Sequence, residues 1–322
     1  MDGAVLEDVS LNYNVETDGV LSMPLKPNVK NYMRFVAIED SQINLTSINS
    51  STGEADTSVD LKHSKDGVTW TQYDFNPIPL AAGETLYLKG NNENGFTAEP
   101  RICVFGDLSI LGIQNIPSTG KFECHGNIMS LLYGDNFEDK TTIPSVSCYQ
   151  FMFFNCTSLT TAPELPATTL TEGCYQNMFG GCTSLTTAPE LPATTLASQC
   201  YSSMFGGCTS LTTAPELPAT TLVSQCYHSM FNSCTSLTTA PELPATTLVY
   251  GCYSYMFKGC TNLNHITMLA TDIPEMSAIE CMYTWVEGVA SNGIFVKHPD
   301  MHTIGNSPSG IPIGWTVENA VI

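Results

Sequence analysis

Ten of the thirteen cysteines occupy two fixed positions in a repeated segment, and their spacing limits the chemistry of their thiols. No C-x-x-C pair with the spacing of zinc ligands occurs. The two cysteines of one copy are eight residues apart, about 12 Å along a helix, whereas a disulfide needs Cα atoms within about 7 Å. We therefore expect a structural ladder of reduced, buried thiols that pack as small apolar side chains. Its members are Cys148, Cys156, Cys174, Cys182, Cys200, Cys208, Cys226, Cys234, Cys252 and Cys260.

Other groups that could perform catalysis or bind metal show no established pattern. Among six histidines only His298 and His302 are four residues apart, and the intervening Pro299 argues against a helical pair of metal ligands. The chain has no nucleophile elbow, P-loop or H-E-x-x-H motif. The segment SKDGVTW resembles the Asp-box hairpin of sialidases but lacks one residue of it, so an ordinary Asp-Gly hairpin explains it as well. We expect no catalytic residue, no cofactor and no metal site.

Threonines are the best candidates for a binding surface. The segment CTSLTTAPELPATTL occurs four times without substitution, so stacked copies would present columns of hydroxyl and methyl groups on a flat, uncharged face. Such a face suits a glycan or a protein, although threonine could simply satisfy an exposed sheet and its turns. An ice-binding face is disfavoured because these threonines are adjacent rather than at i and i+2. The candidate binding face comprises Thr160, Thr161, Thr186, Thr187, Thr212, Thr213, Thr238 and Thr239.

Each copy divides into two halves that must position these side chains. The first half, C-Y-x-x-M-F-x-x-C, places Cys174, Met178 and Cys182 at i, i+4 and i+8, which predicts a short helix. The second half contains Pro189 and Pro192, which exclude a helix and leave a short strand in S-L-T-T-A. One unit cannot bury its own apolar side. The copies must therefore stack into a curved solenoid, with strands on one face and helices on the other.

The segment MFGGCTSLTTAPELPATTL resembles the BspA-like leucine-rich repeats, whose pattern runs roughly aFxgCtsLtsI-x-iP. The resemblance covers residues 148–275, about two-fifths of the chain, in five copies that share aromatic, Cys, Leu and Pro positions. The family often has Ile where this chain has Ala188 and Glu190. Members of this family are bacterial surface proteins that attach to host proteins or to other cells, and the resemblance implies such a role.

The predicted fold class is α+β, with an N-terminal antiparallel β-sandwich followed by a curved solenoid of 26-residue leucine-rich repeats, each a short strand plus a short helix. Short alternating runs such as MRFVAI and ETLYLKG indicate the sandwich, and Asp66-Gly67 predicts a two-residue hairpin turn. GIFVKH and GIPIGWTV predict strands in a degenerate last repeat. The predicted divisions are an N-terminal arm or edge strand (1–31), the sandwich (32–115), an N-terminal cap (116–147), five repeats (148–276) and a C-terminal cap (277–322).

The net negative charge of the chain limits the classes of partner that it can bind. The chain has 31 acidic and 11 basic residues and a net charge of −20, whereas nucleic acids and anionic membranes bind clustered Lys and Arg. No apolar run reaches the length of a membrane span, and the start lacks the basic and apolar regions of a secretory signal. We expect a protein or glycan partner on a cell surface, or other virion proteins, with no nucleic acid and no membrane insertion.

Three functional hypotheses follow. The first is a non-enzymatic adhesion protein that is extracellular or displayed on the cell surface after its signal peptide is removed. The alternative is a phage virion protein, such as a fibre, decoration or receptor-binding component, which fits the absence of a signal and an acidic β-domain able to dock. A carbohydrate-active enzyme accessory module is a further alternative. The repeated Glu164, Glu190, Glu216 and Glu242 argue against an enzyme, since one catalytic carboxylate would not be needed four times.

Overall fold

The computed structural model describes residues 29–97, 101–109, 113–271, 273, 280–301 and 304–322. These residues are rich in strands and turns and contain few helical residues, which fits an α+β or mainly β class. The predicted N-terminal arm lies outside the described residues, apart from Val29, Lys30 and Asn31. None of the described helices is both long and apolar enough to cross a bilayer.

A six-stranded sheet forms most of the N-terminal region, in the order β10-β9-β1-β7-β4-β5. Neighbouring strands are antiparallel, as expected, except that β9 and β10 are parallel. Its strands are β1 (Arg34–Ala37), β4 (Leu61–Ser64), β5 (Thr71–Gln72), β7 (Thr85–Gly90), β9 (Phe122–His125) and β10 (Leu159–Thr161). Two further antiparallel pairs are β2 (Ser41–Ile43) with β6 (Ile78–Leu80), and β3 (Thr46–Asn49) with β8 (Arg101–Val104).

The sheet joins the N-terminal region to the repeats. Strand β9 pairs with β1 on one side and with β10, which belongs to the first repeat, on the other. A short α-helix, α1 (Ser130–Tyr133), and a 3-10 turn, η2 (Gly134–Asn136), follow β9. Hydrogen bonds of one sheet therefore run from residues 32–115 into the first repeat without interruption.

The hairpin between β4 and β5 forms, but its predicted two-residue turn is wrong. The last paired residues are His63 and Thr71, and the segment between them is a longer loop. Ser64 and Asp66 fold this loop by accepting hydrogen bonds from its own backbone N–H groups, including those of Gly67 and Thr69. These side-chain bonds replace the backbone ladder that a two-residue turn would have continued.

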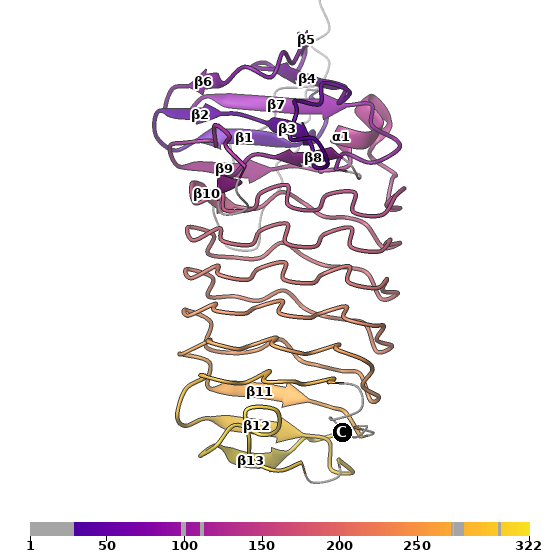
Figure 1. Ribbon diagram of the computed structural model, residues 1–322, viewed down its shortest axis with the longest axis vertical. Helices are drawn as coiled ribbons and strands as arrows, with labels where there is room; N and C mark the ends of the chain where they lie inside the picture. The colour runs from indigo at the N-terminus through magenta and orange to yellow at the C-terminus, as the bar shows by residue number, and fades with distance from the viewer. Residues whose placement is uncertain (1–28, 98–100, 110–112, 272, 274–279, 302–303) are drawn as a thin grey trace, which may run out of the picture.

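The five copies stack in chain order as successive layers (Figure 1). They are numbered by their first cysteines: Cys148, Cys174, Cys200, Cys226 and Cys252. The core between the layers consists of columns of identical buried side chains. Tyr149, Tyr175, Tyr201, Tyr227 and Tyr253 stack with ring centroids 5.8–6.2 Å apart. Phe105, Phe153, Phe179, Phe205, Phe231 and Phe257 form a second column with spacings of 5.5–5.7 Å.

The predicted helices of the repeats are wrong. Residues 141–271 are all described, and none of them is helical. Within copy two, the N–H of Gln176 donates to the oxygen of Gly173, three residues earlier, at 3.0 Å. The N–H of Tyr175 instead donates to Cys200 of the next copy, also at 3.0 Å. These two kinds of bond alternate along the segment, so that consecutive β-turns form a ribbon that is hydrogen-bonded to the next layer.

A left-handed residue at every fourth position produces this turn ribbon. In copy two these residues are Gly173, Asn177 and Gly181, with φ of 59°, 54° and 75°. An α-helix has no such residues, since L side chains avoid positive φ. The four-residue period places Cys174, Met178 and Cys182 on the buried side, as a helix would. The structure thus preserves the predicted inward face while replacing the predicted conformation.

The opposite half of each copy contains little continuous strand. Among the four copies that have a Leu-Thr-Thr segment, only the first forms a strand there, β10, whereas Thr187 and Thr213 form an isolated parallel bridge. The last layers form a parallel sheet of β11 (His265–Met268), β12 (Ile294–Lys297) and β13 (Thr316–Asn319). Strand β12 lies in GIFVKH, which confirms the first predicted C-terminal strand. Strand β13 overlaps the predicted GIPIGWTV only at Thr316 and Val317, because residues 310–315 form turns and a single bridge.

Candidate functional site

The candidate threonine face is exposed over most of the stack. In copies two, three and four both threonines of the pair are exposed: Thr186, Thr187, Thr212, Thr213, Thr238 and Thr239. In copy one Thr160 and Thr161 are only half-buried, because they lie in β10 beside β9. The Thr160 hydroxyl donates to the carbonyl oxygen of Phe122 at 3.0 Å. The structure therefore aligns three of the four predicted pairs as solvent-facing columns.

The bonding of the threonine hydroxyls differs between the copies. The hydroxyl and N–H of Thr212 both donate to the carbonyl oxygen of Thr186 in the preceding copy, at 3.2 and 3.0 Å. The hydroxyls of Thr187, Thr213 and Thr239 make no hydrogen bond to another described residue. Of the six exposed threonines of the pairs, Thr212 alone has a hydroxyl bonded to another described residue, so the second threonine in copies two to four presents a hydroxyl that a ligand could use.

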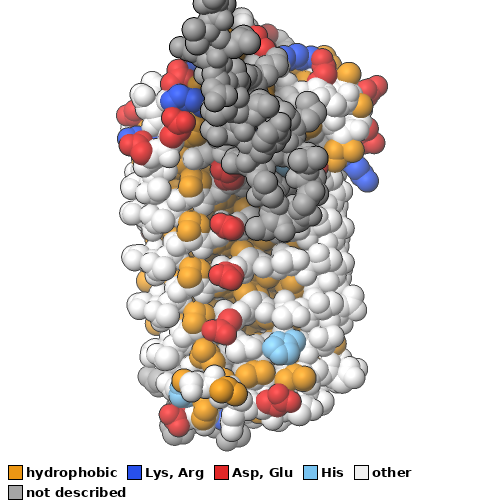
Figure 2. Space-filling model, turned by 180° about the vertical axis from the view of Figure 1, so that it is seen from behind, with side chains coloured by type: hydrophobic (Ala, Val, Ile, Leu, Met, Phe, Trp, Pro, Cys, Tyr) orange, Lys and Arg blue, Asp and Glu red, His pale blue; other side chains and the backbone are white. Residues whose placement is uncertain are grey.

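Exposed glutamates recur along the stack, close in sequence to the threonine pairs. Glu164, Glu190, Glu216 and Glu242 are exposed, and each lies three residues after a threonine pair. Figure 2 shows acidic side chains in a column on one face of the stack, beside a column of hydrophobic side chains. Asn31 donates to both carboxylate oxygens of Glu164 at 2.9 Å. Their repetition is visible in the sequence, whereas their alignment into a column depends on how the layers stack.

The cysteine ladder lies inside the stack. All thirteen cysteines are buried and free. The thiols of Cys182, Cys208, Cys234 and Cys260 donate to phenylalanine carbonyl oxygens of the preceding copy at 2.9–3.1 Å. Burial raises the pKa of the Cys208 thiol to about 12, despite its hydrogen bond to the backbone. Thiols of this kind are neutral and inaccessible, which suits packing and excludes nucleophilic chemistry.

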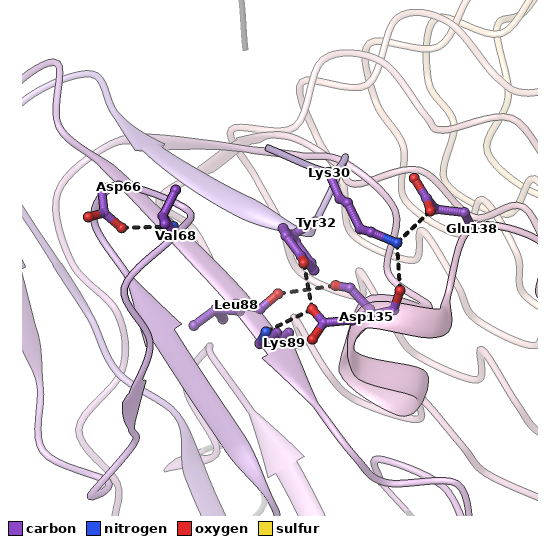
Figure 3. Close-up of polar contacts among 9 residues, drawn as sticks. Lys30, Tyr32, Asp66, Val68, Leu88, Lys89, Asp135 and Glu138 are labelled. Carbon is purple, nitrogen blue, oxygen red and sulfur yellow. Dashed lines mark hydrogen bonds and ion pairs between the residues drawn. The ribbon is translucent and has the colours of Figure 1, made fainter. Parts of the chain in front are cut away.

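A polar cluster lies between the six-stranded sheet and η2 (Figure 3). Asp135 accepts hydrogen bonds from Lys89 at 2.7 Å and from the Tyr32 hydroxyl at 2.5 Å. The Lys89 bond contributes most to holding the pKa of Asp135 below its usual range. The Lys89 ammonium also lies 4.2 Å from the centroid of Trp70. Every charged group in this cluster has a partner within the fold, so its role is to fix η2 against the sheet.

The Asp-box-like segment also has a structural role. The Asp66 carboxylate accepts hydrogen bonds from the N–H groups of Thr69 and Val68 at 2.7 and 2.8 Å, and from the Ser64 hydroxyl at 2.7 Å. These bonds hold the pKa of Asp66 well below its usual range. The carboxylate is therefore occupied in folding its own loop. Trp70, at the end of the loop, packs edge-on against Tyr32.

No group of three or more His, Cys, Asp or Glu in the described part of the chain is arranged to hold a metal ion. His302, one member of the only suggestive histidine pair, lies outside the described residues. Comparisons with protein-family models, curated proteins and solved structures found no match to this chain. The geometry of the exposed columns is therefore the basis for a functional proposal.

Proposed function

We propose that this chain is a non-enzymatic binding or adhesion protein that contacts a glycan or a protein on a cell surface through its threonine columns. The observation that carries the proposal is the register of Thr187, Thr213 and Thr239, which place the same free hydroxyl on three consecutive layers. A surface built from identical units suits a repetitive ligand, because each added layer repeats the same contact. The neighbouring glutamates add a hydrogen-bond acceptor to each layer.

The proposal includes the finer fold. We interpret the stacked copies as a leucine-rich-repeat solenoid of the BspA-like type, attached to a sandwich-like N-terminal region. The columns of Tyr, Phe and Cys support this interpretation, since each side chain packs mainly against its equivalent in the next layer. The turn ribbon takes the place that a helix would have. The resemblance in sequence and this repeat packing together favour display at a cell surface.

The direct test removes the free hydroxyls without changing side-chain shape. Binding of the fluorescently labelled full chain to a glycan array and to immobilised matrix proteins would be compared with that of the triple variant Thr187→Val, Thr213→Val, Thr239→Val. Valine retains the β-branched shape that favours an extended strand. We expect the triple variant to lose about tenfold or more in affinity, which corresponds to about 1.4 kcal/mol over three contacts.

A matched control replaces three other exposed threonines, as Thr183→Val, Thr209→Val, Thr261→Val. These residues directly follow the second cysteine of their copies and lie outside the threonine columns. The control should bind as the wild type does. Equal binding by the wild type and the Thr187, Thr213 and Thr239 variant would refute the use of this face.

The other hypotheses make different predictions. A virion protein would assemble with other virion proteins, and an accessory module of a carbohydrate-active enzyme would bind the polymer that its enzyme degrades. We place both below the adhesion proposal, because no feature of the described residues favours either of them over a repeated contact surface.

A further inference from the structure

We infer that the turn ribbons of the last layers carry a second binding site, an aromatic patch that takes an uncharged pyranose ring of a glycan. The aromatic patch consists of His228 in copy four, Tyr255 in copy five and Tyr283 in the C-terminal cap. It lies on the turn ribbons rather than on the threonine columns, so it goes beyond the proposed function and does not depend on it.

The three rings of the patch form a continuous chain across three layers. Tyr255 meets His228 with ring centroids 5.4 Å apart and Tyr283 with centroids 5.3 Å apart, edge-to-face in both cases. Tyr283 is 46% exposed, and the other two rings are half-buried. Backbone hydrogen bonds fix the spacing, since the N–H of Tyr255 donates to the oxygen of Tyr283 at 2.9 Å. The patch is thus both rigid and open to solvent.

Packing does not account for these aromatic residues. In the equivalent positions copies two to five otherwise have small or polar residues, such as Ser202 and Ser254 in place of His228, and Ser203 and Ser229 in place of Tyr255. Copy one has the aromatic Phe151 in place of Tyr255. Tyr255 is half-buried, yet it is not among the described side chains that pack against the main core. At the other end of the stack Phe151 packs edge-on against Phe154, which in turn packs against the smaller core of Ile48, Val104 and Leu108.

The backbone conformation at Tyr255 gives a second reason to infer that its ring binds a partner. Its φ is 57°, a left-handed conformation that bulky side chains adopt at a steric cost. In copies two to four the same position has φ of 54° and holds Asn177, Ser203 and Ser229, whereas in copy one Phe151 has φ of 61° and is supported by Phe154. Asn tolerates positive φ better than a bulky aromatic residue does. An aromatic ring that is strained, half-exposed and outside the core is explained better by a contact with a partner than by the fold.

Polar groups beside the rings suit a sugar. Lys258 lies 5.6 Å from the centroid of Tyr255 and pairs with Glu287 at 2.7 Å, and both charged groups are exposed. Lys258 is also the only Lys or Arg between residues 141 and 260. Because the pair is neutral in sum, it can donate to and accept from hydroxyls without selecting an ionic ligand. Tyrosine faces supply a rigid apolar platform for the CH face of a pyranose, and their hydroxyls add polar contacts.

The test uses the full chain on an array of neutral and acidic oligosaccharides, followed by titration of the best neutral ligand. The variants Tyr255→Ser and Tyr283→Ser introduce a small side chain like those of the equivalent positions in other copies, so they should fold, which circular dichroism and a thermal melt would check. We expect each to lower affinity about tenfold and the double variant to abolish measurable binding.

Tyr250→Ser is the matched control, because Tyr250 is 49% exposed and has no aromatic contact with another described residue. It should stay within about twofold of the wild type.

Three outcomes would overturn the inference. These are binding of no glycan by the wild type, binding of acidic glycans only, and wild-type affinity in the Tyr255→Ser, Tyr283→Ser double variant. Glycan binding that the Thr187, Thr213 and Thr239 variant loses but the tyrosine variants retain would belong to the threonine columns and would refute the patch alone. Loss in the tyrosine variants with retention in the threonine variant would support the patch, whatever the fate of the threonine proposal.

Discussion

The phenylalanine carbonyl oxygens show why a cysteine recurs in the second position of each copy. The oxygen of Phe179 accepts the N–H of Cys182 from its own copy at 3.0 Å and the thiol of Cys208 from the next copy at 3.1 Å. A thiol is small and apolar, yet it is also a weak donor, so it fills the space and satisfies the second lone pair. Leucine would be too large here, and alanine would lose the contact.

The buried thiols predict a steep loss of stability in alkali. Burial raises the pKa of Cys208 from 9.0 to about 12, and it raises the pKa of the other nine ladder cysteines in the same direction. Between these two values the unfolded chain releases protons that the folded chain retains, which favours unfolding. The contribution is complete below pH 9 and is lost as the pH rises towards 12, by up to about 1.4 kcal/mol per pH unit for each thiol.

Urea unfolding at pH 7, 8, 9 and 10 would measure this effect. The free energy of unfolding should change little from pH 7 to pH 8 and fall sharply between pH 9 and pH 10. The variant Cys182→Ala, Cys208→Ala, Cys234→Ala should start less stable and show a shallower fall. A free energy that stays constant from pH 7 to pH 10 would mean that the thiols are exposed or already oxidised.

At the scale of the element, the turn ribbon explains why the sequence suggested a helix. Apolar residues at i, i+4 and i+8 mark one face of a helix, but they also mark one face of a chain of four-residue turns. The distinguishing signal was the residue at every fourth position, which is Gly, Asn, Ser or Gln in copies two to four. Gly173, Gly181, Gly207 and Gly259 therefore indicate a repeating left-handed conformation rather than helix ends.

Two adjacent glycines provide a sharp test of the ribbon. Gly207 has φ of 76°, whereas Gly206 is not left-handed, and an added Cβ on either would meet no atom closer than 3.5 Å. Gly207→Ala should therefore lower the free energy of unfolding by about 1–2 kcal/mol through backbone strain alone. Gly206→Ala should be neutral or stabilise by up to about 1 kcal/mol. Chemical denaturation would measure the free energy of unfolding of both variants. Equal changes in the two variants would argue against the turn ribbon.

At the scale of the whole molecule, the N-terminal region covers and stabilises the first layer of the stack. Phe122 of β9 packs edge-on against Phe35 of β1, with ring centroids 5.3 Å apart. Phe105 begins the phenylalanine column that Phe153 continues. Without residues 1–115, β9 would lose β1 and the column would lose its first ring, which would expose apolar side chains.

A fragment of residues 116–322 should consequently fold poorly. We expect it to aggregate or to melt well below the full chain, because its first layer would present an open strand edge and unpacked aromatic rings. Size-exclusion chromatography and a thermal melt would show this. A monomeric fragment with the melting temperature of the full chain would indicate that the repeats fold independently.

Much of this architecture follows from residue types that repeat, and the rest depends on geometry between layers. The 26-residue period, the burial of Cys174 and Met178 and the strand in GIFVKH are readable in the sequence. The conformation of the ribbon is not, because a four-residue period fits two backbones. The exposed threonines could be expected, but the column of acidic side chains and the contact of Tyr255 with Tyr283 arise only when successive layers are brought into register.

The most direct test of a repeated contact surface is to change the number of layers. Deleting residues 182–207 joins Gly181 to Cys208, removes one 26-residue unit in register and leaves His228, Tyr255 and Tyr283 in place. Duplicating the same unit adds one layer. Affinity for the ligand found on the array should fall several-fold on deletion and rise several-fold on duplication, because each layer adds one equivalent contact. Affinity that does not change with the number of layers would contradict a repetitive binding face.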